Sequence, residues 1–167
     1  MTDLLIWPPL LGVLGMVVAV IIYMIVRGYD PGSEALQKIA NAIHEGAMVF
    51  MKREYTQLAI FAAVLVVAIF FSLGSSTAIA FLAGAISSAC AGWFGMYTAT
   101  QANVRTTNAA HTDGQASALS VAFFGGSIMG LAVASLGLIG LGSVYYFFGG
   151  DPETAHHIHG FGMGGSV

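Results

Sequence analysis

The chain has 167 residues, of which 57% are hydrophobic and only 8% are charged. Soluble domains carry about 25% charged residues, so this composition excludes an ordinary soluble protein and indicates a multi-pass membrane protein. Five Lys and Arg residues against eight Asp and Glu residues give a net charge of −3, which argues against nucleic acid as a partner. The single cysteine, Cys90, stands in an apolar run and is interpreted as a small buried residue.

The first predicted element is a membrane-spanning helix from Leu4 to Val26, a stretch without a charged residue. A cleaved signal peptide fits less well, because Asp3 stands where a basic segment is expected and the apolar stretch is too long. Pro8 and Pro9 lie near the start of the span, where a missing amide donor costs least. We therefore expect a retained first span.

The second predicted element is one long helix within residues 30–73, with Asp30 or Ser33 as its N-cap. No Pro or Gly interrupts the sequence between Gly46 and Gly74, so we expect a continuous helix of about 40 residues, about 60 Å long. That length is twice the thickness of a hydrocarbon core, which is about 30 Å. The helix must therefore project from the membrane.

The two halves of this long helix differ in character. Its lipid-spanning part is predicted from about Tyr55 to Leu73, where no residue is charged, and Lys52, Arg53 and Tyr55 mark the headgroup layer at its start. Its first half is amphipathic, with apolar residues that recur at helical spacing and predict one apolar face. These residues are Leu36, Ile39, Ala40, Ile43, Ala47, Phe50 and Met51.

A third span is predicted from Ala78 to about Tyr97, after a tight turn at residues 74–76 that makes it an antiparallel neighbour of the second span. Helical character can continue to Ala110, so this helix also projects from the membrane.

A fourth helix is predicted over residues 113–148, with its apolar part at 117–148. Thr112 and Gln115 have the spacing of a capping box at its start. The aromatic run 145–148 at its end resembles an interfacial belt.

The basic residues predict the orientation of the spans. All five lie after the first or the third span, and basic loops face the cytoplasm. The N-terminus is then outside, and the long second and third helices project into the cytoplasm. The basic residues are Arg27, Lys38, Lys52, Arg53 and Arg105.

Two stripes of small residues predict close contacts between helices, since membrane helices associate through close backbone approach. Small residues are also simply common in membrane helices, and the partner of a stripe can lie outside this chain. On the fourth helix the stripe is Ala118, Ala122, Gly126, Gly130 and Ala134, and on the third it is Ala80, Gly84, Ser88 and Gly92.

None of the four predicted spans contains an ionisable Asp, Glu, Lys, Arg or His residue. An ion-translocating site normally requires one, so no carboxylate relay is expected within these spans. The same observation argues against a rotary proteolipid, which the glycine-rich helices could otherwise suggest. No phosphate-binding loop, nucleophile elbow or dinucleotide fingerprint is present.

Three polar features remain as candidates. His156, His157 and His159 invite a metal hypothesis, but their spacing is poor for one site and an exposed polar loop is the preferred interpretation. His44, beside a glutamate, is interpreted as a solvated or hydrogen-bonded residue. Arg105 stands in a polar run close to the membrane, where it could hold a neighbouring helix or an anion, with snorkelling to the interface as the default.

Four motifs, taken together and in this order, resemble the N-terminal part of the membrane-bound inorganic pyrophosphatases. Two are long and specific: GYDPGSEALQKIANAIHEGAMVFMKREY at 28–55 and YTATQANVRTTNAA at 97–110. The other two are glycine-rich: ALSVAFFGGSIMGLAV at 118–133 and GFGMGGS at 160–166. The resemblance covers essentially the whole chain.

The resemblance implies an all-α homodimeric pump of sixteen transmembrane helices that couples hydrolysis of pyrophosphate to transport of protons or sodium ions. The substrate is then a Mg²⁺ complex held by inner helices, K⁺ is a possible activator, and the four spans here belong to the supporting outer ring. The family's catalytic and metal-binding motifs would lie beyond Val167, so no catalytic, cofactor-binding or metal-binding residue is assigned to this chain.

Residues 160–167 resemble the start of the family's fifth helix. The sequence ends in mid-pattern, which suggests a truncated or split gene product or a partial sequence. The chain alone is expected to be inactive. The alternative is a non-enzymatic membrane interaction module that reuses the same outer-ring fold.

Overall fold

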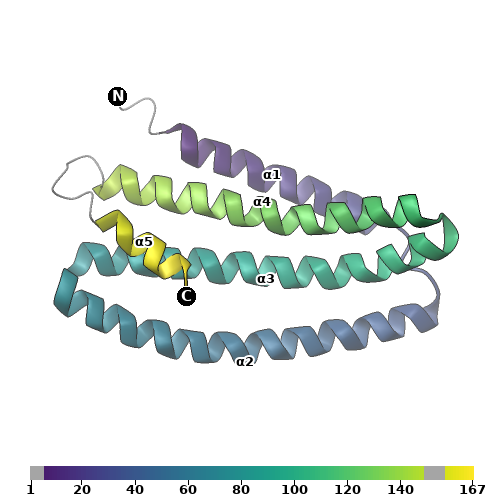
Figure 1. Cartoon of the computed structure of the whole chain (residues 1–167), viewed down its shortest axis with the longest axis horizontal. Helices are drawn as coiled ribbons and strands as arrows, with labels where there is room; N and C mark the ends of the chain where they lie inside the picture. The colour runs from purple at the N-terminus through teal and green to yellow at the C-terminus, as the bar shows by residue number, and fades with distance from the viewer. Residues whose placement is uncertain (1–5, 149–156) are drawn as a thin grey trace.

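The computed structural model describes residues 6–148 and 157–167, and all of its regular elements are helices. The predicted all-α class is confirmed. Figure 1 shows four long helices lying side by side and a short fifth helix against one end of the group. The helices are α1 (Trp7–Gly28), α2 (Glu34–Leu73), α3 (Ser75–Thr112), α4 (Gln115–Phe148) and α5 (Ile158–Gly165).

The four long helices are each long and apolar enough to cross a membrane. They coincide with the four predicted spans, although α1 begins at Trp7 and residues 1–5 lie outside the described part. α2 is one uninterrupted helix of 40 residues, as predicted from the absence of Pro and Gly after Gly46. α3 is likewise continuous and runs two residues past the predicted end at Ala110.

Ser33, and not Asp30, caps the start of α2. The Ser33 hydroxyl accepts a hydrogen bond from the Leu36 amide at 3.4 Å. The Asp30 carboxylate instead accepts one from the amide of Gly32 at 2.9 Å, within the loop that precedes the helix. Asp30 therefore shapes the connection between α1 and α2, and the prediction that left both residues open is resolved in favour of Ser33.

The two turns between the long helices are tighter than predicted. Gly74 alone separates α2 from α3, with a φ of 92°, and Ser75 already belongs to α3. The predicted capping box at Thr112 is wrong, because Thr112 is the last residue of α3 and its hydroxyl donates to the Asn108 carbonyl at 3.1 Å. Gly114, with a φ of 89°, makes the turn into α4.

α3 is the centre of the structure, since each of the other helices packs against it. α4 lies on one side of α3 and is itself covered by α1, whereas α2 lies on the opposite side (Figure 1). The predicted antiparallel pairing of the second and third helices is confirmed. One buried cluster joins α1, α3 and α4 through Ala19, Val26, Ala102 and Ile128.

The small-residue stripe of α3 makes the predicted close contact, and its partner is α5. A side chain at Gly84 would collide with the backbone carbonyl of Phe161, and one at Gly164 would collide with the carbonyl of Phe81. Ala80 is fully buried in the same contact. The glycines thus let the α5 backbone lie directly on the α3 backbone.

The stripe of α4 is buried only at its first member, Ala118, and its other four members have no partner in the described part of the chain. Ala122, Gly126, Gly130 and Ala134 are exposed, and open space surrounds both glycines. α4 uses a neighbouring face for its contacts within the chain, where Gly125 touches Ala102 of α3.

The predicted apolar face of α2 is divided between a covered and an open part. Met51 is buried against α3, and Leu36, Ala40 and Ala47 are half-buried. Ile39, Ile43 and Phe50 remain exposed over 60%, 53% and 57% of their surfaces. This open part is an apolar surface on a half of the helix that is otherwise polar.

Tyr55, which was predicted to mark the headgroup layer on α2, lies beside the middle of the third span. The Tyr55 hydroxyl donates to the Ala89 carbonyl at 2.7 Å. Ala89 precedes the predicted end of the third span, Tyr97, by about 12 Å of helix. The point at which α2 changes from polar to apolar, near Tyr55, is therefore not level with the corresponding point of α3, near Tyr97.

Contacts made by α4 show which part of α1 lies level with these positions of α2 and α3. Gly140 of α4 lies next to Ser87 of α3, and the adjacent Ile139 packs on Gly12 of α1. The exposed charged residues 52–54 of α2 thus lie level with the apolar body of α1. A charged surface at that depth calls for cover by something other than lipid tails.

Candidate functional site

A polar cavity lies between α2 and α3, near the loop that joins α1 to α2. Its volume is about 130 Å³. It is lined by Pro31 of the loop, by Gln37, Ala40 and Asn41 of α2, and by Thr100, Gln101, Val104 and Arg105 of α3. We call it the Arg105 pocket.

Arg105 is the charged member of this pocket, and it is buried to all but 8% of its surface. Its Nη1 donates to the Gln101 backbone carbonyl at 2.7 Å and approaches the Gln101 side-chain oxygen at 3.4 Å. Its Nε is buried without a hydrogen-bond partner. The default prediction of snorkelling is therefore wrong, because α2 covers the side chain instead of leaving it to reach solvent.

A polar and aromatic contact continues from the pocket toward α1. His44 Nδ1 lies 2.7 Å from the hydroxyl of Thr100, and its ring meets the edge of Tyr97 at 5.2 Å. Tyr97 in turn contacts Tyr23 of α1 at 6.5 Å between ring centroids. His44 is hydrogen-bonded, but the expected pairing with the adjacent glutamate is wrong, because its partner is Thr100 on α3 and Glu45 is exposed.

The loop beside the pocket is fixed by Asn108 of α3. The Asn108 side-chain amide donates to the Asp30 carbonyl at 3.1 Å. Gly32, with a φ of 83°, lies so close that a side chain there would collide with the Asn108 oxygen. The Gln37 amide also donates to the Gly32 carbonyl at 2.7 Å. These contacts hold the start of α2 against the end of α3.

The histidine pattern does not form a metal site in the described residues. His156 lies outside them. His157 is the residue before α5, where its Nδ1 is 2.8 Å from the Thr77 hydroxyl and its ring contacts Phe148, and His159 is an exposed residue of α5. The prediction of an exposed polar loop is therefore wrong for His157, whereas His159 is exposed as predicted but lies in a helix.

The described residues do not bring together three or more His, Cys, Asp or Glu side chains in a group that could hold a metal ion. Hard cations such as Mg²⁺ require several oxygen ligands, which this part of the chain does not offer in one place. Cys90 is half-buried, not fully buried as predicted. The chemistry that the Arg105 pocket can support is binding. Its buried cation and neutral amides can recognise a negatively charged group, but they supply neither a nucleophile nor a general base.

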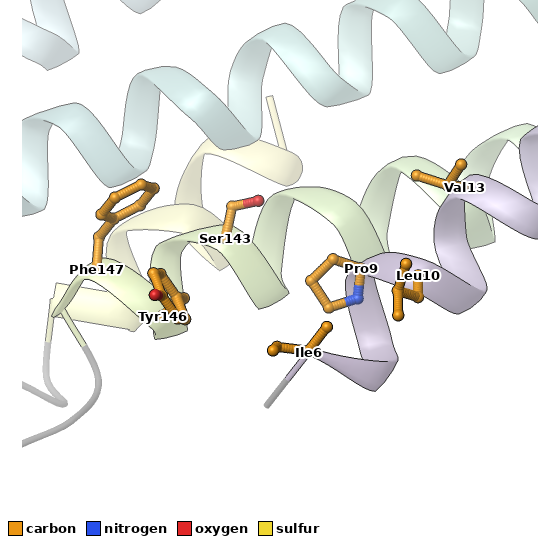
Figure 2. A pocket seen from close by; sticks show the side chains of 7 residues that line it. All are labelled: Ile6, Pro9, Leu10, Val13, Ser143, Tyr146 and Phe147. Carbon is orange, nitrogen blue, oxygen red and sulfur yellow. The ribbon is translucent and has the colours of Figure 1, made fainter. Parts of the chain in front are cut away.

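Two further cavities are mainly apolar. One, of about 280 Å³, lies between the first turns of α1 and the last turns of α4, and Figure 2 shows its lining residues. Ser143 is its one polar side chain besides Tyr146, and the Ser143 hydroxyl already donates to the Ile139 carbonyl at 2.6 Å. The other, of about 300 Å³, lies among α3, α4 and α5 at the glycine contact. Neither carries a charged residue in its lining.

Sequence reasoning missed three contacts that join α3 to α2 and to the loop before α2. The pairs are Asn108 with Asp30, His44 with Thr100, and Tyr55 with Ala89. Each joins residues more than 30 positions apart, so spacing along one helix carries no signal for it. The one available signal was the high number of polar side chains at residues 97–110, which is unusual in such an apolar chain and indicates polar contacts there.

Comparison with known sequences shows one family across nearly the whole chain. Residues 13–167 match the sequence profile of the family described as inorganic H⁺ pyrophosphatase. The chain is 40% identical to a K⁺-insensitive pyrophosphate-energized proton pump of Methanosarcina mazei, over 100% of this chain and 24% of that protein. It is 43% identical to a second such proton pump, of Moorella thermoacetica, over 93% of this chain and 23% of that protein.

A sodium pump matches as well. The chain is 44% identical to a K⁺-stimulated pyrophosphate-energized sodium pump of Thermotoga maritima, over 71% of this chain and 16% of that protein. The chain thus spans about a quarter of the length of the curated relatives that it matches over its full extent. Its agreement with the family profile from residue 13 to residue 167 shows that the chain belongs to the inorganic H⁺ pyrophosphatase family.

Proposed function

We propose that this chain forms the N-terminal, outer part of a membrane pump that couples hydrolysis of pyrophosphate to transport of protons or sodium ions. The observation that carries the proposal is the family match over residues 13–167. The relatives that match are pyrophosphate-energized pumps by name. The chain contributes membrane-spanning helices and their projecting ends, and the chemistry belongs to the rest of the pump.

The surfaces of the four long helices support this assignment. The stripe of α4 around Gly126 and Gly130 is open, as is the apolar surface of α2 at Ile39 and Ile43. The charged residues 52–54 of α2 lie at the depth of the apolar body of α1. Further helices of the pump would cover all three surfaces, as expected for outer-ring helices that surround a catalytic core.

Substrate and metal are assigned to residues outside this chain. Pyrophosphate and Mg²⁺ need clustered carboxylates and cations, whereas the described residues offer one buried cation and no acidic group that could hold a metal. Mg²⁺ would neutralise charge on the phosphate oxygens and lower the pKa of the attacking water. The complete pump is proposed to be a homodimer.

The transported ion and the effect of K⁺ are not set by these residues. The chain is 40% identical to a K⁺-insensitive proton pump and 44% identical, over a shorter match, to a K⁺-stimulated sodium pump. The similar identity to both kinds of pump supports the proposal that ion choice and K⁺ dependence are determined by other parts of the polypeptide.

A chimera tests the proposal. This chain replaces the matching segment of the Methanosarcina mazei pump, and Mg²⁺-dependent release of phosphate from pyrophosphate is measured in membranes. We expect hydrolysis by the chimera well above background, and none by the 167-residue chain alone or by the remainder of the pump alone. Activity of the isolated chain would place the chemistry within these residues. A chimera that inserts into the membrane but is inactive would favour the alternative of a non-enzymatic module.

The proposed orientation places the N-terminus outside the cell membrane and the start of α2 in the cytoplasm. It is tested with single cysteines at Ser33 and Ser76 in a Cys90→Ala background, labelled in intact cells with a reagent that does not cross the membrane. We expect labelling at position 76 and protection at position 33. The reverse pattern would invert the topology.

A further inference from the structure

Among the described residues, no acidic side chain pairs with the positive charge of Arg105. Its side chain is buried to all but 8% of its surface, and the hydrogen bonds from its Nη1 go to neutral oxygens of Gln101. Buried cations in proteins are nearly always paired, because desolvating an unpaired charge is costly. The Nε of Arg105 is a buried donor with no acceptor.

The surroundings of the guanidinium are built for a small anion. Besides Arg105, the polar side chains that line the pocket are neutral, namely Gln37, Asn41, Thr100 and Gln101, and none of the lining residues is acidic. The nearby carboxylate of Asp30 is hydrogen-bonded to the Gly32 amide within its own loop. The cavity of about 130 Å³ has room for a group of a few heavy atoms, not for a large ligand.

We propose that the Arg105 pocket binds one carboxylate, which pairs with the Arg105 guanidinium. A guanidinium presents its donors in a fork that matches the two oxygens of a carboxylate. The positive charge of Arg27 on α1 also acts on the Arg105 guanidinium, so the site favours an anion over a neutral ligand. The amide of Asn41 is a second donor at the same cavity.

The occupant in the complete protein is an Asp or Glu side chain from the part of the pump outside this chain. This step rests on the proposed function. It is supported by the length of the relatives, of which this chain spans 24% in the Methanosarcina mazei pump. A carboxylate inserted between α2 and α3 would tie the projecting halves of both helices to the rest of the pump.

Nuclear magnetic resonance of the arginine Nε groups tests the site directly. The chain contains three arginines, Arg27, Arg53 and Arg105, so ¹⁵N-arginine labelling in detergent micelles gives three Nε–H signals. Arg27→Lys and Arg53→Lys assign two of them and leave the third to Arg105. We expect added acetate, at constant ionic strength, to move the Arg105 signal in a saturating manner while the two exposed arginines respond weakly and without saturation.

Two matched variants and two other anions sharpen the result. Asn41→Leu removes an amide from the pocket and is expected to weaken acetate binding several-fold, whereas Asn103→Leu changes an exposed asparagine outside the pocket and leaves it unchanged. Inorganic phosphate and micelles containing phosphatidylglycerol are added separately. A saturating response to either, without one to acetate, would overturn the carboxylate assignment. An Arg105 signal that moves in parallel with Arg53 would overturn the site itself.

The same signal in the chimera identifies the source of the carboxylate. There we expect the Arg105 signal at the acetate-bound position before any acetate is added, with no further change on addition. A signal that still responds to acetate would show that the pump's own polypeptide does not fill the pocket. Because acetate binding by the isolated chain does not depend on pyrophosphatase activity, this test can succeed or fail independently of the proposed function.

Discussion

A single hydroxyl joins α2 to α3 at the point where α2 changes from charged to apolar. The Tyr55 hydroxyl donates to the Ala89 carbonyl at 2.7 Å, and the hydroxyl also fills the space above Gly92. The donor comes from the one residue of the sequence KREYTQ that is turned toward α3 and half-buried. This bond therefore fixes how far α2 slides along α3.

Removing this hydroxyl should weaken the contact between the two helices. Tyr55→Phe is expected to lower the free energy of unfolding by about 1 kcal/mol, since the bond is lost and the Ala89 carbonyl gains no new partner. Unfolding of the 167-residue chain in mixed micelles measures this value. Tyr145→Phe, at an exposed position near the end of α4, is the control and should change it little. Equal effects of both variants would contradict a structural role for the Tyr55 bond.

At the residue scale, the sequence predicted the kinds of residue at the helix ends but not the choice among them. Asp30 and Ser33 are both good N-cap types, and the choice depends on the loop geometry that Asn108 imposes from 78 positions away. Thr112 has the right spacing for a cap, but its hydroxyl is used in the last turn of α3. Arg105 was recognised as a candidate, whereas its burial by α2 could not be foreseen from its own segment.

At the scale of helices, the glycines of α3 and α4 have different roles despite similar spacing. Gly84 lies under the Phe161 carbonyl of α5, whereas Gly126 of α4 has open space around it. Spacing alone predicted both stripes. Which of them meets a neighbour within this chain depends on the rotation of each helix, and only packing against α1, α2 and α5 sets that rotation.

An alanine at each position should therefore have opposite effects on the isolated chain. Gly84→Ala forces the α5 backbone away and is expected to cost about 1–3 kcal/mol, as overpacked positions do. Gly126→Ala adds a methyl group in open space and should stabilise the helix by up to about 1 kcal/mol. Unfolding in micelles compares the two. Destabilisation by Gly126→Ala in the isolated chain would show a contact that the structure does not contain.

The open apolar surface of α2 makes a prediction about assembly. Ile39→Ser with Ile43→Ser removes exposed apolar groups, so the stability of the isolated chain should hardly change and its tendency to associate in solution should fall. In the chimera the same pair should lower pyrophosphate hydrolysis several-fold, because the surface would then be an interface with the rest of the pump. Light scattering and phosphate release measure the two effects.

Met51→Ser provides the matched control for this surface. Met51 is on the same helix but is buried against α3, so its loss should destabilise the isolated chain by about 2–5 kcal/mol. If the two isoleucine changes were as destabilising as the Met51 change, the open surface would be covered within this chain. If they left the chimera fully active, the surface would not be an interface of the pump.

At the scale of the whole molecule, composition and periodicity were sufficient for the all-α membrane class and for the four long helices. The uninterrupted second helix followed from the amphipathic pattern of its first half and from the absence of Pro and Gly between Gly46 and Gly74. The relative depth of the helices did not follow, because it depends on contacts such as Tyr55 with Ala89 and Gly12 with Ile139. That relative depth sets the charged residues 52–54 of α2 level with the apolar part of α1, on the opposite side of α3.

The central claim is that this chain works as one part of a pyrophosphate-driven pump, and coupled transport by the chimera tests it most directly. Inverted membrane vesicles containing the chimera with the Methanosarcina mazei pump are supplied with pyrophosphate and Mg²⁺, and a pH-sensitive dye reports the acidity of their interior. We expect pyrophosphate to acidify the vesicles, and a proton carrier to abolish the gradient without stopping hydrolysis. A chimera that is present in the membrane at normal levels but generates no gradient would contradict the account.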